Sequence, residues 1–292
     1  MKILSRVLFL ATFFLAACGG AGSPRLVIGS KNFTEQTVLA ELLAQHLEST
    51  LAIRVERRAN LGGTLICHEA VKAGQIDLYV EYTGTALTAV LHEESSSDPE
   101  EVRRRVKEAY AKQFDLEVTE PLGFDNSFAI VIRGDDARRL NLRTLSEAAG
   151  PATQWRAGFG YEFMERPDGF PGLASTYGLK FAQAPLLMDL GLLYRALEDK
   201  QVDVVAGSAT DGVIAARGFV VLEDDKHYFP PYEAVPVVNR GALERHPALR
   251  GILSALGGKI TAEEMRKLNY AVDGDHRDVK DVVREFLKTR KL

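Results

Sequence analysis

The stretch Ile76–Thr85, with the sequence IDLYVEYTGT, places a short apolar strand pattern directly before the start of a helix. The strand pattern covers Ile76–Tyr82, and Thr83–Thr85 supplies the small polar residues that begin helices. In open α/β sheets, ligands bind where strands end and helices begin, because the free N–H groups of a first helical turn attract anions. The stretch therefore predicts an α/β fold with Tyr82 beside a binding site.

Strand and helix patterns alternate along the chain on both sides of this stretch, which is typical of α/β proteins. We expect further strands at residues 26–29, 53–57, 128–132, 156–160, 180–184, 202–206 and 234–238. We expect helices at residues 34–48, 62–74, 100–113, 145–149 and 190–198, with two more, 263–268 and 279–287, near the end of the chain. The run Arg103–Arg105 is interpreted as a solvated helix face.

The patterns form two similar blocks, which predicts two lobes with a ligand cleft between them. Residues 25–127 and 234–292 are predicted to form a discontinuous first lobe, since the segment after Val238 is too small to be a domain alone. Residues 128–233 are predicted to form the second lobe. The chain would then cross between the lobes twice, near residues 125–128 and near residues 231–235.

The composition limits the classes of function. The chain has 292 residues, of which 46% are hydrophobic and 26% are charged, and its net charge is −4. These values are typical of a globular protein and exclude a disordered, collagen-like or multi-span membrane protein. Without a strong positive field, we expect no nucleic-acid partner.

Chemical motifs indicate binding rather than catalysis. The sequence contains no G-x-S-x-G, Walker A or H-E-x-x-H motif, and its six histidines are widely scattered. We therefore expect no metal site, no cofactor and no enzyme activity. The two cysteines, Cys18 and Cys67, exclude a CxxC site, and Cys67 lies in an apolar helical pattern that is typical of a small buried residue.

The N-terminal segment is predicted to direct export. Lys2 and Arg6 precede an apolar run that is too short to span a bilayer. The run ends in Leu15-Ala16-Ala17-Cys18, which resembles a bacterial lipoprotein cleavage box. The resemblance implies a signal peptide at residues 1–17, a lipid on the Cys18 thiol, a tether at residues 18–24, and a lipoprotein anchored to a membrane and facing the periplasm or the cell exterior. The alternative is an ordinary secretory signal with a coincidental cysteine.

Ligand-binding groups can be predicted from strand ends alone. Lys31 follows the strand that ends at Gly29 and precedes a helix N-terminus, where a full positive charge adds to the free N–H groups. Tyr82 closes another strand and offers a ring face. One end of the cleft therefore suits a ligand that carries a carboxylate, beside an aromatic ring.

Six blocks, in order along the mature chain, resemble one known family. The similar blocks are Leu26–Gln36, Asn60–Thr64, Ile76–Thr85, Gly123–Ala129, Thr210–Gly212 and Phe229–Pro236. The family that they resemble comprises the osmoprotectant ABC-importer binding proteins of the ProX and OpuC type, which take glycine betaine, choline, carnitine and related quaternary amines. The resemblance implies a two-lobed periplasmic-binding-protein fold of type II, which closes on its ligand and passes it to a permease driven by an ATPase. We expect the protein to act as a monomer.

The resemblance also implies roles for individual residues. Tyr82, Phe128 and Tyr232 would form the walls of an aromatic box, in which ring faces select a quaternary ammonium group that has no N–H to donate. Lys31 and Thr85 from the first lobe and Arg166 from the second would bind the ligand carboxylate. The alternative for Arg166 is an ion pair with Asp168 or Glu165 on the surface.

The chain departs from the family pattern at two positions. Ser208 stands where some members carry a tyrosine, and Phe128 stands where a tyrosine is frequent. A wider box could admit carnitine or a betaine with an aromatic side chain such as ergothioneine, and Tyr161, after the strand end at Gly160, could supply a replacement wall. An enzyme or a ligand sensor on the same two-lobed fold are the alternatives from other classes of function.

Overall fold

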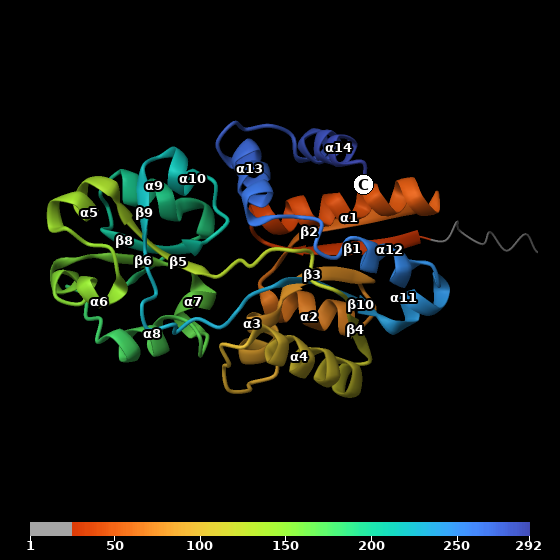
Figure 1. Ribbon diagram of the computed structural model, residues 1–292, viewed down its shortest axis with the longest axis horizontal. Helices are drawn as coiled ribbons and strands as arrows, with labels where there is room; N and C mark the ends of the chain where they lie inside the picture. The colour runs from red at the N-terminus through yellow and green to blue at the C-terminus, as the bar shows by residue number, and fades with distance from the viewer. Residues whose placement is uncertain (1–24) are drawn as a thin grey trace, which may run out of the picture.

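The computed structural model describes residues 25–292, so the predicted signal peptide, the tether and Cys18 lie outside the described residues. The described chain forms two five-stranded sheets, each flanked by helices (Figure 1). We call the part built on the first sheet the first lobe, and the part built on the second sheet the second lobe. The α/β class expected from the alternating patterns is confirmed.

The first sheet has the strand order β2-β1-β3-β10-β4. Its three N-terminal strands run parallel, and β10 runs antiparallel to both of its neighbours, with Ala234 opposite Tyr82. Because β10 enters from the second lobe, it starts at the edge where β3 ends. The strands are β1 (Arg25–Lys31), β2 (Arg54–Gly62), β3 (Leu78–Tyr82), β4 (Leu116–Val118) and β10 (Ala234–Asn239).

The second sheet has the order β7-β6-β8-β5-β9. β6 runs parallel to β7 and β8, whereas β5 runs antiparallel to β8 and β9, and Phe128 pairs with Ser208 in this ladder. The strands are β5 (Phe128–Arg133), β6 (Ala157–Phe159), β7 (Leu186–Leu187), β8 (Val204–Ser208) and β9 (Phe219–Leu222).

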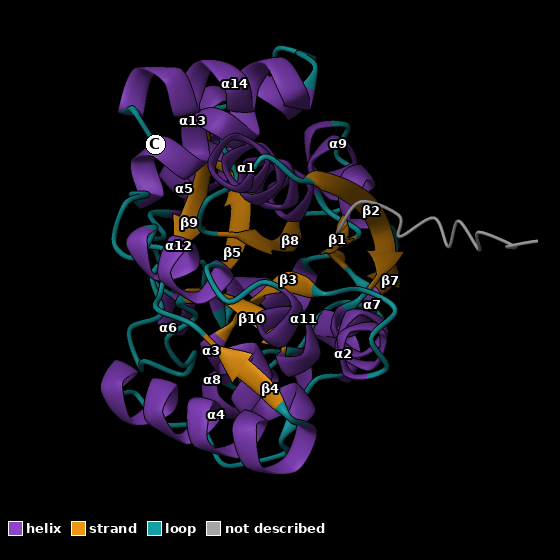
Figure 2. Ribbon diagram, turned by 90° about the vertical axis from the view of Figure 1, so that its right-hand side faces the viewer, coloured by secondary structure: helices purple, strands orange, loops and turns teal. Residues whose placement is uncertain are grey.

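Helices cover both faces of the first sheet. In both views, α1, α13 and α14 lie on one face and α2 and α4 on the other (Figures 1 and 2). Side-chain caps fix several starts: Asp98 caps α4, Thr261 and Glu264 form a capping box on α13, and Asp278 caps α14. The elements are α1 (Thr34–Leu51), α2 (Thr64–Lys72), α3 (Thr83–Thr85), the π-helix η1 (Ala86–Val90), α4 (Pro99–Phe114), α11 (Arg240–Arg245), α12 (Leu249–Ala255), α13 (Ala262–Asp273) and α14 (Val279–Arg290).

The helices of the second lobe are shorter. Residues of α5 to α8 join one apolar cluster and residues of α9 and α10 join another, so that both faces of this sheet are also covered. The elements are α5 (Gly134–Leu140), α6 (Leu145–Ala148), the 3-10 turn η2 (Pro151–Gln154), α7 (Tyr161–Glu165), α8 (Phe170–Tyr177), the 3-10 turn η3 (Leu190–Leu192), α9 (Leu193–Glu198) and α10 (Val213–Ala216).

The core of the first lobe consists of two apolar layers, one on each side of its sheet. Leu26 and Ile28 of β1 point to the α1 side and are fully buried, together with Leu39 and Leu43. Burying one such side chain contributes about 1.5–3 kcal/mol. Cys67 lies in the layer on the other side, where burial raises the pKa of its thiol to about 12, so the cysteine is a buried apolar residue as predicted.

Two segments cross between the lobes (Figure 1), and hydrogen bonds join them to each other. Asp125 and Glu233 form an antiparallel bridge, and the N–H of Asn126 donates to the carbonyl of Tyr232 at 3.0 Å. Arg103 of α4 holds this ribbon by donating to both carboxylate oxygens of Glu233 at 3.0 Å. The side chain of Arg103 is only 26% exposed, so the prediction that it belongs to a solvated face is wrong. No local sequence pattern indicates this, because Glu233 lies 130 residues away.

The strand expected at residues 180–184 is also wrong. Phe181 packs against Phe159 and Phe170, and the N–H of Ala182 donates a single backbone bond to the carbonyl of Trp155 at 2.9 Å, so no ladder forms along this segment. Regular pairing with β6 begins only at Leu186, after Pro185, which has no N–H to donate. Within residues 25–292, no helix is long and apolar enough to cross a membrane, and no group of acidic, histidine or cysteine side chains is arranged to hold a metal ion.

Candidate functional site

A cavity of about 1180 Å³ lies between the two sheets. β1, β3 and β8 end at it, and the antiparallel strands β5 and β10 start beside it, so five strand ends from both lobes converge there. All the ligand-binding residues predicted from the sequence line this cavity, namely Lys31, Tyr82, Thr85, Phe128, Tyr161, Arg166, Ser208 and Tyr232.

Phe128 stands at the centre of one aromatic group. Its ring meets Tyr232 edge-on, with 5.7 Å between ring centroids, and Phe163 at 4.8 Å. Tyr82 forms a second group with Phe33, whose ring is stacked at 6.4 Å. Ring faces therefore line the cavity from both lobes, at the strand ends where the sequence predicted them.

Arg166 lies against the rings instead of on the surface. Its guanidinium carbon is 5.0 Å from the centroid of Phe128 and 5.9 Å from that of Tyr232, within cation–π range. The side chain is 10% exposed and donates to Asp168 through Nε at 2.9 Å and through Nη2. The alternative of an ion pair with Asp168 is thus correct in its partner but not in its surface location.

Asp168 is shared between the guanidinium and a ring hydroxyl. The hydroxyl of Tyr232 donates to Asp168 at 2.6 Å. Burial opposes the charge of this carboxylate, but the hydrogen bonds and the charge of Arg166 outweigh burial and hold the pKa of Asp168 below its usual range. Arg166 and Asp168 therefore form a charged pair that is fixed inside the site.

Lys31 has a similar environment on the first lobe. Its ammonium group pairs with the buried carboxylate of Glu81, donates to the hydroxyl of Thr64 at 3.0 Å, and lies 5.1 Å from the ring centroid of Tyr82. Lys31 is 2% exposed and Glu81 is fully buried. Each cation predicted to hold a ligand carboxylate is thus already bonded to a carboxylate of the protein.

The remaining predicted residues occupy the margins of the site. Thr85 is buried in the single turn of α3. Ser208 ends β8 opposite Phe128, and its N–H donates to Asp211 at 2.8 Å. Tyr161 begins α7 at the rim, and with 55% of its surface exposed it encloses the cavity less than Tyr82 or Tyr232 does.

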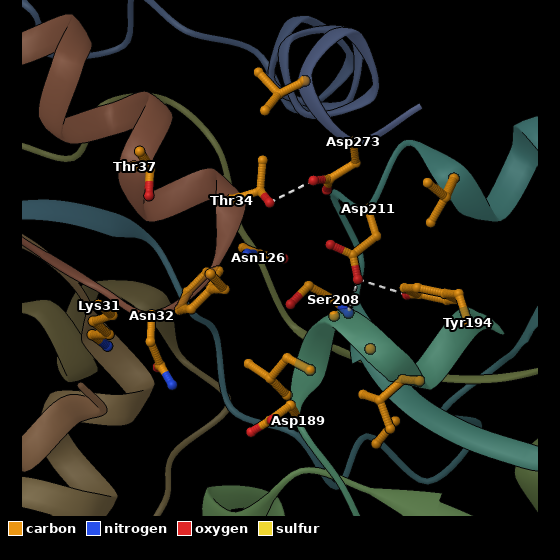
Figure 3. A pocket seen from close by; sticks show the side chains of 18 of the residues that line it. Lys31, Asn32, Thr34, Thr37, Asn126, Asp189, Tyr194, Ser208, Asp211 and Asp273 are labelled. Carbon is orange, nitrogen blue, oxygen red and sulfur yellow. Dashed lines mark hydrogen bonds between the residues drawn. The ribbon is translucent and has the colours of Figure 1, made fainter. Parts of the chain in front are cut away.

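The cavity extends past Ser208 into a more polar end (Figure 3). There the hydroxyl of Tyr194 donates to Asp211 at 2.6 Å, and the hydroxyl of Thr34 donates to Asp273 at 2.6 Å. Burial raises the pKa of Asp211 to about 6. This end of the cavity therefore offers carboxylate oxygens to a cationic or N–H-bearing ligand group.

The lobes touch where Glu162 of α7 reaches the start of α2. Its carboxylate accepts from the N–H of Thr64 at 2.6 Å, which satisfies a free donor of that helix end. Gly63 makes the approach possible, because a Cβ atom there would lie 2.1 Å from a carboxylate oxygen of Glu162. A carboxylate from the second lobe thus caps a helix of the first.

Sequence reasoning missed Glu81, Glu35 and Glu162 around the site, and it named Asp168 only as an alternative surface partner of Arg166. Glu81 directly precedes Tyr82, and Asp168 lies two residues after Arg166, so proximity in the sequence was a usable signal for both. Glu35 and Glu162 lie in helical segments where a glutamate normally faces solvent. Tertiary packing brings them to the site: Glu35 bonds Tyr82 within the first lobe, and Glu162 reaches across from the second lobe.

Comparisons with known proteins identify the family. Residues 24–289 match the model described as the substrate-binding domain of the ABC-type glycine betaine transport system. The chain is 35% identical over 288 residues to the carnitine transport binding protein OpuCC of Listeria monocytogenes, covering 98% of this chain and 93% of that protein. It is 34% identical over 266 residues to the ergothioneine transport permease/ergothioneine binding protein EgtU of Helicobacter pylori, covering 90% of this chain and 47% of that protein.

Solved structures confirm the predicted fold. A crystal structure of a glycine betaine/carnitine/choline ABC transporter protein superposes with a TM-score of 0.76 at 33% identity, covering 91% of this chain and 98% of that chain. The two-lobed periplasmic-binding-protein fold of type II is therefore correct, as is the resemblance seen in the sequence blocks. The chain belongs to the family of substrate-binding domains of ABC-type glycine betaine transport systems.

Proposed function

We propose that this protein captures a quaternary amine in the cavity between its lobes and delivers it to an ABC permease powered by an ATPase, without a catalytic step of its own. The observation that carries this function is the set of ring faces in one buried cavity. Tyr82, Phe128 and Tyr232 line it, and cationic groups of the protein already lie within 6 Å of each of these ring centroids. Ring faces that hold an ammonium or guanidinium group can also hold a trimethylammonium group.

We assign the ligand carboxylate to Lys31, Thr85 and Arg166. Arg166 bonds Asp168 through Nε and Nη2, and among the described residues Nη1 has no protein acceptor, so one edge of the guanidinium remains for a ligand oxygen. Lys31 lies near its buried partner Glu81 and would share its charge between that carboxylate and the ligand. Zwitterionic betaines suit such a site, because they bring both charges.

A larger betaine is the second candidate ligand, and Ser208 favours it. In the β5–β8 ladder, Ser208 places a small hydroxyl opposite Phe128, and the cavity continues beyond it to Tyr194 and Asp211. At about 1180 Å³, the space exceeds the needs of glycine betaine, since pockets for drug-sized ligands span about 300–1,000 Å³. Carnitine or ergothioneine would extend toward Asp211.

We further propose that the protein works as an exported monomer, anchored by a lipid on Cys18. Substrate-binding proteins of ABC importers act outside the cytoplasm, which agrees with the leader-like N-terminal sequence. The anchor would keep the binding domain near its permease while the segment between Cys18 and Arg25 acts as a tether.

Calorimetry with glycine betaine, choline, carnitine and ergothioneine tests the function. Tyr82→Leu and Tyr232→Leu keep an apolar side chain but remove a ring face, and each should weaken binding of the preferred amine by roughly tenfold or more, since a desolvated cation–π contact contributes about 2 kcal/mol. Tyr110→Leu is the matched control, because Tyr110 is equally buried in the first lobe but lies outside the cavity. Absence of binding to every amine, or equal affinity of all the variants, would refute the function.

A further inference from the structure

Glu35 is a buried carboxylate that the predicted site does not use. It lies in the first turn of α1 and is 2% exposed. Among the described residues it has no cationic partner, yet its two oxygens accept four hydrogen bonds from side chains. A buried charge of this kind is tolerated only where its donors are held in place around it.

The four donors come from four separate parts of the molecule. One oxygen accepts from the hydroxyl of Tyr82 at 2.6 Å and from the amide of Asn126 at 2.8 Å. The other accepts from the amide of Asn269 at 2.9 Å and from the hydroxyl of Thr210. Tyr82 is an aromatic wall of the cavity, Asn126 lies on a crossover segment, Asn269 lies on α13, and Thr210 follows β8 in the second lobe.

The donors are also bonded to one another. The N–H of Thr210 donates to the side-chain oxygen of Asn126 at 3.3 Å, and the amide of Asn269 donates to the carbonyl of Thr210 at 3.0 Å. Gly212 lets the same loop pack closely on α13, because a Cβ atom there would lie 2.5 Å from the Arg266 carbonyl. The loop after β8 is therefore held against the first lobe through the surroundings of Glu35.

We propose that Glu35 is a positioning residue that both fixes the ring of Tyr82 and joins the two lobes through Thr210. The same carboxylate thus sets the orientation of one wall of the site and the angle at which the second lobe meets the first. The ring-positioning half of this role rests on the proposed function, whereas the joint between the lobes does not.

Three variants separate the two halves of the role. Thr210→Val keeps the shape of the side chain and removes the hydroxyl donor of the second lobe. Tyr82→Phe keeps the ring and removes its bond to Glu35. Glu35→Gln affects both halves, because its amide group has one acceptor oxygen where the carboxylate has two, so an N–H₂ group must face two of the four donors.

Glu41 provides the matched control. It lies on the same helix, is 4% exposed, and pairs with Arg57 within the first lobe, away from the cavity. Glu41→Gln therefore reports the general cost of neutralising a buried carboxylate on α1. Melting temperatures of all the variants are recorded, so that loss of stability is separated from loss of positioning.

Small-angle scattering of the ligand-free full chain tests the joint. We expect Thr210→Val and Glu35→Gln to increase the radius of gyration relative to wild type, and Tyr82→Phe and Glu41→Gln to leave it unchanged. Calorimetry with the amine that the wild-type protein binds then tests the ring: affinity should fall about tenfold or more in Glu35→Gln and severalfold in Tyr82→Phe, but not in Glu41→Gln.

The possible failures are distinguishable. If Glu35→Gln matches Glu41→Gln in both scattering and affinity, Glu35 has only a structural role and the inference is wrong. If the wild-type protein binds none of the amines, the proposed function fails, while the scattering of the ligand-free variants still decides the joint.

Discussion

Removing Arg166 should change the ligand preference of the protein as well as its stability. The residue is 9% exposed, and its guanidinium bonds Asp168 through two nitrogens and lies over the rings of Phe128 and Tyr232. In Arg166→Ala, Asp168 stays buried and loses its bonds to the guanidinium, while its bond from the Tyr232 hydroxyl remains. Breaking a buried ion pair in this way costs about 3–5 kcal/mol of the free energy of unfolding.

Two consequences of this change can be measured. For a chain of this size the melting temperature should fall by roughly 6–20 °C, at about 2–4 °C per kcal/mol. Affinity for glycine betaine should fall by roughly ten- to a hundredfold, because a charge-assisted hydrogen bond to the ligand carboxylate contributes about 1.5–3 kcal/mol. Choline has no carboxylate, so its affinity should change much less.

Two further variants separate stability from selectivity. In Arg166→Ala combined with Asp168→Asn, no charge is left unpaired, so much of the stability should return while the preference for glycine betaine over choline stays reduced. Arg133→Ala is the control, because Arg133 is a largely buried arginine of the second lobe that pairs with Asp136 and Asp203 outside the cavity. The assay is calorimetry well below the lowest melting temperature. An unchanged ratio of the two dissociation constants in Arg166→Ala would refute the role given to this residue.

Three other predictions concern the cavity and the anchor. Ser208→Tyr places a ring opposite Phe128 and should strengthen glycine betaine binding but weaken ergothioneine binding in calorimetry; parallel changes for both ligands would contradict this. Burial raises the pKa of Asp211 to about 6, above its ordinary 3.8, so its contribution to stability is present at low pH and is lost as pH rises through 6. As pH rises from 5 to 7.5, the free energy of unfolding of Asp211→Asn should therefore increase relative to that of wild type in denaturant titrations. A difference between the two proteins that stays constant with pH would contradict this prediction. Cys18→Ala should release the protein from membranes, as fractionation would show. Mass spectrometry that finds the wild-type chain cut elsewhere than before Cys18 would contradict the lipid anchor.

The positions of the ring-bearing strand ends could be predicted from the sequence. Tyr82 ends β3 and Phe128 begins β5 as expected, because an apolar run followed by small polar residues is a local pattern. The family resemblance then indicated which rings and cations line the cavity. A local pattern alone could not have selected Arg166, which lies in an irregular segment between two short helices.

The pairing of charges could not be predicted in the same way. Lys31 meets Glu81 across 50 residues, and the donors to Glu35 lie 47 to 234 residues away from it. Such contacts depend on how sheets and lobes pack, which hydrophobic periodicity does not encode. Arg103 was misread for the same reason, since its partner Glu233 is 130 residues distant.

The bonded ribbon between the lobes also sets how far each part of the site travels. Backbone bonds between the two crossover segments resist sliding of one along the other, so we expect the lobes to rotate about an axis that passes through the ribbon. Phe128 directly follows one crossover segment, and Tyr232 lies on the other. We therefore expect both rings to stay together in a rotation about the ribbon, whereas the bond between Thr64 and Glu162 joins the two lobes directly and would break. A cation that enters between separated lobes would then meet Phe128 and Tyr232 together, and the contact between Glu162 and Thr64 would form last.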